Sequence, residues 1–173
     1  MSLDSAAFCQ QILEAHNRLR QQHGSPALTM SSDLSEQAQH WAEKLAARRH
    51  LAYCELPGIG ENITFFPIWI DGEKVVEHWY SENMKYEYDT PGWQAGTNYF
   101  TQIVWKTTEE IGVGRAFVLP DTTDGNADMT THAGNLNEQV VVAFYRPAGN
   151  NNRVGQFAAN VHKPTNVNSI GQE

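Results

Sequence analysis

One ten-residue stretch, Gly96 to Trp105, constrains the fold more than any other part of this sequence. It joins a polar, turn-forming start to an aromatic and β-branched run that ends in tryptophan. Bulky apolar side chains of this kind are buried in folded proteins, because their removal from water is favourable. Taken alone, the stretch therefore indicates a buried segment that follows a turn.

Length and cysteine content indicate one globular domain. A chain of 173 residues buries roughly 70% of the surface that its unfolded form exposes, so disulfides are not required for stability. Residues 1–164 are predicted to form this domain, and the polar residues 165–173 are predicted to form a disordered tail. Only Cys9 and Cys54 are present, which allows one disulfide at most, whereas small secreted domains usually carry more.

The charge balance argues against nucleic acid as a partner. Twelve basic and twenty acidic side chains give a formal net charge of −8, and no stripe of lysine and arginine could follow a phosphate backbone. A cluster of Lys44, Arg48 and Arg49 is better explained as a solvated helix face than as a lipid contact. No apolar run reaches the ~18 residues of a membrane-spanning helix.

Hydrophobic periodicity predicts three helices. The first begins at Asp4 or Ser5 and ends before Gly24, with its apolar side chains on one face. The second runs from Ser32 to about Arg49. The third runs from about Glu73 to Tyr88. The apolar stripe of the first helix consists of Phe8, Ile12, Ala15 and Leu19, and that of the second consists of Leu34, Ala38, Trp41 and Leu45.

Runs of β-branched and aromatic residues predict strands between and after these helices. Glu61 to Phe66 is predicted to be a short strand, which Pro67 keeps from being a central one. Ile111 to Leu119 and Gln139 to Arg146 are predicted to form an antiparallel pair. The acidic segment between them, Pro120 to Glu138, is predicted to be a surface loop, since its spacing lacks the glycine and glutamate of an EF-hand.

Four strings, in order along the chain, together resemble the CAP family, which comprises cysteine-rich secretory, antigen 5 and plant pathogenesis-related type 1 proteins. Besides Gly96 to Trp105, they are His16 to Arg20, Gly60 to Ile63 and Phe144 to Asn150. Within that family, the sequence is most similar to the Golgi-associated, plant pathogenesis-related subgroup. The resemblance implies an α+β fold, a three-layer α-β-α sandwich with a central, mainly antiparallel sheet.

The resemblance also implies a cleft that holds two histidines and two glutamates in many members. Glu61 and Glu82 stand at the glutamate positions, but Tyr53 and Tyr99 stand where the histidines are expected. A neutral phenol, with a pKa near ~10, is a poor zinc ligand at pH 7. We therefore expect no metal, no cofactor and no catalytic residue in this cleft. Without a cation the two carboxylates would repel each other, so one of them should take up a proton or accept a hydrogen bond from Tyr53 or Tyr99, with a raised pKa.

Three other side chains are weaker candidates for chemistry. His78 is four residues before Glu82 on the third helix, a spacing that can chelate a metal. His50 is three residues before Tyr53, and Cys54 could serve as a nucleophile if a histidine were paired with it. Exposed or structural roles are better supported for all three. His16 is expected to tie the first helix to the core.

The resemblance implies a non-catalytic module that binds lipid or membrane, or a protein partner, through a cleft lined by glutamate and tyrosine. Sterol or acidic lipid, a protein partner and a second copy of the chain are the expected partners. The expected location is the cytoplasmic face of Golgi-like membranes. The alternatives are a metal-dependent hydrolase that uses the cleft glutamates, and a secreted defence-related protein whose signal peptide has been removed.

Overall fold

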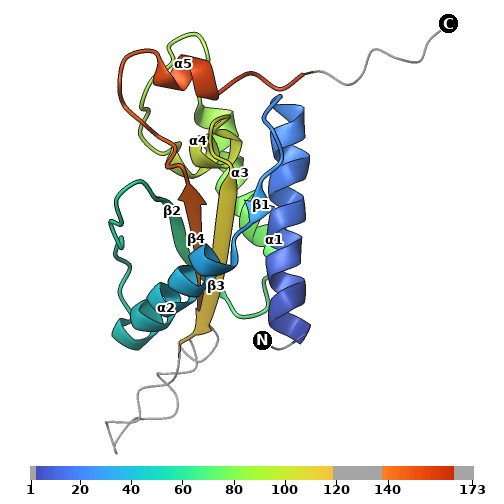
Figure 1. The fold of residues 1–173 in the computed structure, drawn as a ribbon, viewed down its shortest axis with the longest axis vertical. Coiled ribbons are helices and arrows are strands. Elements are labelled where there is room, and N and C mark those ends of the chain that lie inside the picture. The colour runs from blue at the N-terminus through green and yellow to red at the C-terminus, as the bar shows by residue number, and fades with distance from the viewer. Residues whose placement is uncertain (1–2, 119–137, 166–173) are drawn as a thin grey trace, which may run out of the picture.

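The computed structural model describes residues 3–118 and 138–165. Helices and strands alternate along the described chain, and Figure 1 shows their arrangement around a central sheet. In chain order the elements are α1 (Leu3–Gln22), β1 (Thr29–Met30), α2 (Ser32–Arg48), β2 (Gly60–Pro67), α3 (Gly72–Tyr80), the 3-10 helix η1 (Ser81–Lys85), α4 (Asn98–Val104), β3 (Glu110–Phe117), β4 (Glu138–Arg146) and α5 (Gln156–Asn160).

The strands form one sheet in the order β1-β3-β4-β2. Strand β4 pairs in antiparallel register with β3 on one side and β2 on the other, and the two-residue β1 pairs with β3 in parallel. The sheet is therefore mainly antiparallel, as predicted. Strand β2 lies at the edge, where Pro67 at its end interrupts no ladder between two neighbours.

Strand β4 is buried on both faces, because helices cover the sheet on each side and form three layers with it. Its alternate side chains Val140, Val142 and Phe144 pack against α2. The intervening ones pack in the second core, which α1, α3 and α4 cover on the opposite face. All of these side chains have an exposed fraction of 0%, so the predicted α-β-α sandwich is confirmed. The second set consists of Val141, Ala143 and Tyr145.

Two glycines in β3 let the backbone of α2 lie directly on the sheet. A Cβ atom on Gly112 would overlap backbone atoms of Leu34 and Ser35, and one on Gly114 would overlap those of Ala38 and Gln39. Side chains of α2 also bond the outer edge of β3: Ser35 Oγ accepts from the Val113 N–H at 3.2 Å. Gln39 exchanges two bonds with the Arg115 backbone, at 3.0 and 2.8 Å. The edge is thus covered by α2.

Two segments differ from the sequence prediction. The predicted third helix is too long, because α3 ends at Tyr80 and only a 3-10 helix continues to Lys85. Ser81 and Asn83 side chains donate to the carbonyls of His78 and Tyr80, and such bonds compete with the helical pattern. Within Gly96 to Trp105, the chain after the turn forms helix α4, whose residues 100–104 are buried.

The remaining expectations about chain organisation have mixed outcomes. Both cysteines are free, so the one possible disulfide is absent. Of the predicted loop Pro120 to Glu138, only Glu138 is described, as the first residue of β4. Of the predicted tail 165–173, only Thr165 lies within the described residues. The described part of the chain contains no helix long and apolar enough to cross a membrane.

Replacement of Gly112 with alanine is expected to lower the free energy of unfolding by about 3 kcal/mol, because the new methyl group must push α2 off the sheet. Urea denaturation measures this change. Gly24→Ala is the matched control: Gly24 has a φ of +71° and open space around it, so alanine there costs only the left-handed conformation, about 1 kcal/mol. Equal losses in the two variants would contradict the close approach of α2.

Candidate functional site

Glu82 holds the start of helix α4 in place. Its Oε1 atom accepts hydrogen bonds from the backbone N–H groups of Tyr99 at 2.8 Å and Phe100 at 3.1 Å. These are two of the N–H groups that a helix leaves without partners in its first turn. The helix has no side-chain cap of its own at Thr97, so a carboxylate from η1 supplies the missing acceptor.

Arg20 holds the other end of α4 and the turn that follows it. Its guanidinium is fully buried and donates to backbone carbonyls only. Two of these belong to Ile103 and Trp105, at 2.9 and 2.8 Å. The others belong to Pro26 at 2.8 Å and Thr108 at 2.9 Å. Burial lowers the pKa of Arg20 to about 10, which leaves it charged at neutral pH.

The four residues of the expected cleft, Tyr53, Glu61, Glu82 and Tyr99, are here called the tetrad. Glu61 accepts from the backbone N–H groups of Cys54 at 2.8 Å and Glu55 at 3.0 Å. It thereby fixes the segment that carries Tyr53. The Tyr99 hydroxyl donates to the Ile63 carbonyl at 2.9 Å, which ties α4 to β2.

The tetrad side chains lie close enough to act on one another electrostatically. The pKa of Tyr53 is raised, first by partial burial and then by its neighbours Tyr99, Glu61 and Glu82. Burial also raises the pKa of Glu82, against the opposing effects of its two backbone hydrogen bonds and of Lys85 and His78. The structure thus brings all four residues together, although Tyr53 remains 53% exposed.

The donor set of the tetrad does not suit a divalent metal. Zinc in proteins is held by histidine, cysteine and carboxylate ligands, and here two of the four positions are phenols. Within residues 3–118 and 138–165, no group of three or more histidine, cysteine or acidic side chains could hold a metal ion. The carboxylates already accept backbone N–H groups, which makes their present role structural.

The hydrogen bond that Tyr99 was expected to offer a carboxylate is not formed. Tyr99 donates to a backbone carbonyl instead, and both glutamates accept from backbone N–H groups. These donors are backbone N–H groups of a folded loop and of a helix terminus, and the amino-acid sequence alone does not show where they lie. The predicted rise in the pKa of one carboxyl does occur, at Glu82, but its main cause is burial.

The weaker candidates lie around the tetrad rather than in it. His78 is exposed, packs edge-on against Phe66 with ring centroids 5.4 Å apart, and lies near enough to Glu82 to lower its pKa. His50 is exposed beyond the end of α2. Burial and the charge of Glu61 raise the pKa of the Cys54 thiol, against the effect of Lys44. That shift opposes thiolate formation, which a cysteine nucleophile needs.

His16 ties helix α1 to the sheet, as expected. Its Nε2 lies 2.7 Å from the Tyr145 hydroxyl and its Nδ1 lies 2.8 Å from the Ile12 carbonyl. Asn62 donates to the same hydroxyl at 3.2 Å and to the Tyr99 carbonyl at 3.2 Å. Burial lowers the pKa of His16 to about 4. The neutral ring therefore donates its Nδ1–H to the Ile12 carbonyl and accepts a hydrogen bond from the Tyr145 hydroxyl at Nε2.

Sequence reasoning missed the polar contacts that fix the strings singled out above. Gln102 accepts from the Gly149 N–H at 2.9 Å and donates to the Thr108 hydroxyl at 3.2 Å. Thr101 donates to the Asn150 side chain at 2.6 Å. Polar residues inside an otherwise apolar run were the available signal, because a buried polar side chain needs a hydrogen-bond partner.

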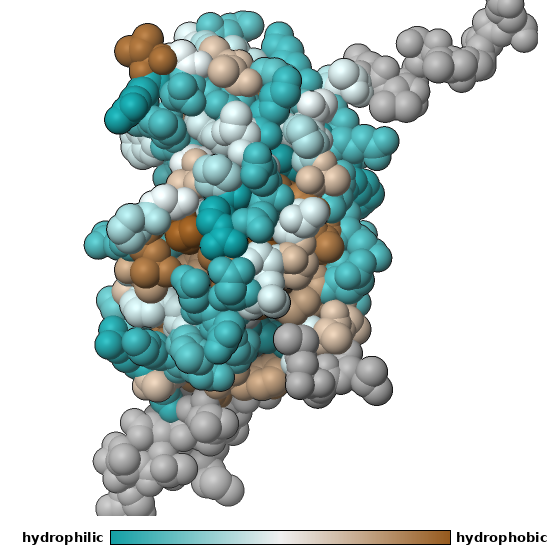
Figure 2. Space-filling view, in the orientation of Figure 1, coloured by the Kyte–Doolittle hydropathy of each residue, from teal (hydrophilic) through white to brown (hydrophobic). Residues whose placement is uncertain are grey.

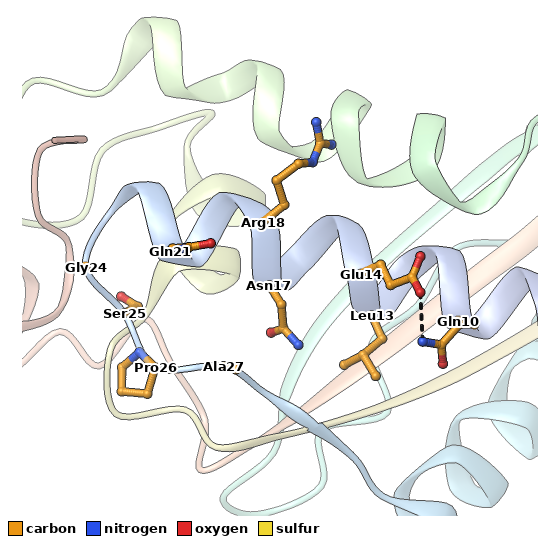
Figure 3. Close-up of a pocket in the computed structure, with 10 residues that line it drawn as sticks. All are labelled: Gln10, Leu13, Glu14, Asn17, Arg18, Gln21, Gly24, Ser25, Pro26 and Ala27. Atoms are coloured by element: carbon orange, nitrogen blue, oxygen red, sulfur yellow. Dashed lines mark hydrogen bonds between the residues drawn. The ribbon is translucent and has the colours of Figure 1, made fainter. Parts of the chain in front are cut away.

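Two surface hollows are lined by residues outside the tetrad. One, of about 680 Å³, separates α1 from residues 24–27, and Figure 3 shows Leu13 and Asn17 on the side of α1 that faces Pro26. The Asn17 amide in this hollow already forms two hydrogen bonds with the Leu28 backbone, one as donor and one as acceptor. The other, of about 950 Å³, lies between α1, α2 and β3, with Cys9 and Arg115 among its lining residues.

Comparisons with known proteins show the family of this chain. The family model described as the cysteine-rich secretory protein family, CAP, matches residues 13–119. The human Golgi-associated plant pathogenesis-related protein 1 is 36% identical over 163 residues, which cover 92% of this chain and 96% of the relative. The secreted protein RBT4 of Candida albicans is 36% identical over 109 residues, 61% of this chain but only 29% of the relative.

Solved structures support the fold as well. The crystal structure of NaASP2 with Zn²⁺ superposes with a TM-score of 0.62 at 19% identity and covers 95% of this chain and 88% of that protein. At this level of identity, the likeness concerns the fold alone.

Glu82→Ala is expected to lower the free energy of unfolding by about 1–2 kcal/mol, because it leaves two N–H groups of α4 without their acceptor. Glu82→Gln keeps an acceptor oxygen and should lose less. Glu77→Ala, an exposed glutamate on α3, is the matched control. Urea denaturation compares the three variants, and equal midpoints for Glu82→Ala and Glu77→Ala would rule out the capping role.

Proposed function

The chain belongs to the cysteine-rich secretory protein (CAP) family, and from this premise we propose that it is a non-catalytic module that associates with lipid membranes. The tetrad serves as a structural joint in this proposal. It connects β2, η1 and α4 through hydrogen bonds and needs no metal or cofactor. The binding partners stay predictions from the resemblance: sterol or acidic lipid, a second copy of the chain, and a protein partner.

The use of both tetrad carboxylates as structural acceptors carries the non-catalytic part of the proposal. Hydrogen bonds from backbone N–H groups stabilise the charged form of a carboxylate, which makes it a weaker base. Glu61 and Glu82 each accept two backbone N–H groups.

The membrane part of the proposal is supported by the human relative. Its name places it at the Golgi, and the two chains match over almost their whole lengths. We therefore propose an intracellular location on the cytoplasmic face of such membranes. The Candida relative is named as a secreted protein, which keeps a secreted defence-related role as the alternative.

Membrane association is tested by flotation of the purified protein with phosphatidylcholine vesicles, alone and with added sterol or phosphatidylserine. We expect the protein to float with at least one of these compositions and to stay at the bottom of the gradient without vesicles. Absence from the floating fraction with every composition would refute the proposal.

Isothermal titration with zinc at pH 7 tests the alternative of a metal-dependent hydrolase. We expect no micromolar binding, because the tetrad lacks imidazole. A double variant, Tyr53→His with Tyr99→His, supplies both missing ligands and should bind zinc, and the further change Glu61→Ala should remove that binding. Micromolar binding by the unmodified protein that Glu61→Ala abolishes would revive the hydrolase.

A further inference from the structure

Three exposed apolar side chains meet at one end of the molecule. Ile68 is 39% exposed, Trp69 is 72% exposed and Phe117 is 45% exposed. All three line one shallow hollow of about 340 Å³, together with residues of the first turns of α1. They are here called the Trp69 patch. Figure 1 shows the start of α1 and the end of β3 at this end of the molecule.

The loop that presents Trp69 is held firmly in place. Gln139 is fully buried, and its amide donates to the carbonyls of Pro67 at 3.1 Å, Ile68 at 3.4 Å and Ile70 at 3.1 Å. At the far end of the loop, the Gly72 N–H donates to Gln11 on α1 at 2.9 Å. Trp69 is therefore exposed on a loop whose backbone is fixed by hydrogen bonds.

The indole of Trp69 has no partner of its own among the described residues. Trp41 and Trp79 donate their ring N–H groups to Ala52 and Thr64, whereas no such bond is formed by Trp69 within residues 3–118 and 138–165. A large apolar ring with an available N–H donor is the combination that favours the boundary between water and lipid, where one part of the ring is dry and the N–H is wet.

The size of the patch favours a bilayer over a protein partner. A stable protein interface takes roughly 20–30 residues from each side and a closely matched shape. The Trp69 patch has only three exposed apolar side chains. On the face that Figure 2 shows, hydrophobic atoms likewise lie in small separate groups. A lipid surface needs no matched shape, and a few apolar side chains that enter it contribute through the area that they remove from water.

The charges around the patch favour zwitterionic lipid. Asp4 and Asp71 line the same hollow. Its arginine, Arg115, is only 12% exposed, is paired with Asp4 at 3.2 Å and stacks on the Phe8 ring at 4.1 Å. Arg115 offsets the charge of Asp4, so Asp71 leaves the lining with a net negative charge, which disfavours the negative surface of an acidic bilayer.

Resting on the proposed function, we propose that the Trp69 patch is the membrane-contacting surface of this protein and that it inserts into the head-group region of phosphatidylcholine bilayers. Ile68 and Phe117 enter beside the indole. Asp4 and Asp71 stay at the level of the choline groups. The other described residues stand above the bilayer.

Flotation with pure phosphatidylcholine vesicles tests the patch. We expect Trp69→Ala to lower the partition coefficient about tenfold or more, in line with the apolar area lost. Trp93→Ala is the matched control, because Trp93 is also exposed, at 56%, and lies on a different loop. Both variants should keep the urea midpoint of the unmodified protein, since neither side chain belongs to the core.

Tryptophan fluorescence with phosphatidylcholine brominated on its acyl chains gives a second readout that does not depend on alanine variants. The unmodified protein and Trp93→Phe should be quenched alike, and Trp69→Phe should lose most of the quenching. If the unmodified protein floats and Trp69→Ala floats equally well, the proposed role of the Trp69 patch is wrong, while the proposed function stands. Flotation only with acidic vesicles would overturn the patch alone, and no flotation at all would overturn both.

Discussion

Helix α4 is held by opposite charges at its two ends, and the candidate site depends on this arrangement. The Glu82 carboxylate accepts the N–H groups of its first turn, and the Arg20 guanidinium binds the carbonyls at its last turn and beyond. Each charge matches the partial charge of the helix end that it meets. Seven residues are too few to form a stable helix alone, so the position of Tyr99 follows from side chains on η1 and α1.

The sheet depends on a second constraint, the close approach of α2. Strand β4 is apolar on both faces and must be covered on both. On one face, α2 achieves this through contact with two glycines of β3, and its Ser35 and Gln39 side chains replace the strand that β3 lacks beyond β1. The same helix therefore supplies both a core layer and a protected sheet edge.

The elements α1, α2, β3 and β4 could be predicted from the sequence, because their apolar residues recur at helical or strand spacing. Their arrangement as a three-layer sandwich followed from the resemblance. Helix α4 could not be predicted in this way, since its β-branched and aromatic residues favour strands and its stability comes from Arg20 and Glu82. The tetrad positions followed from the resemblance, and their proximity is visible in the structure. Their hydrogen bonds were not predictable, because the donors are backbone groups that face the carboxylates only after folding. The Trp69 loop was also missed, since its exposure depends on the buried Gln139.

The neutral state of His16 has a consequence for where such a fold can operate. With a pKa of about 4, the ring does not change its charge between about pH 5 and 8, where an ordinary histidine does. The hydrogen bonds from His16 through Tyr145 and Asn62 to α4 thus stay the same in the cytosol, in mildly acidic organelles and outside the cell. Both cysteines are also free, so the fold does not rely on an oxidising environment. Neither the charge of His16 nor the state of the two thiols therefore ties this fold to one side of a membrane.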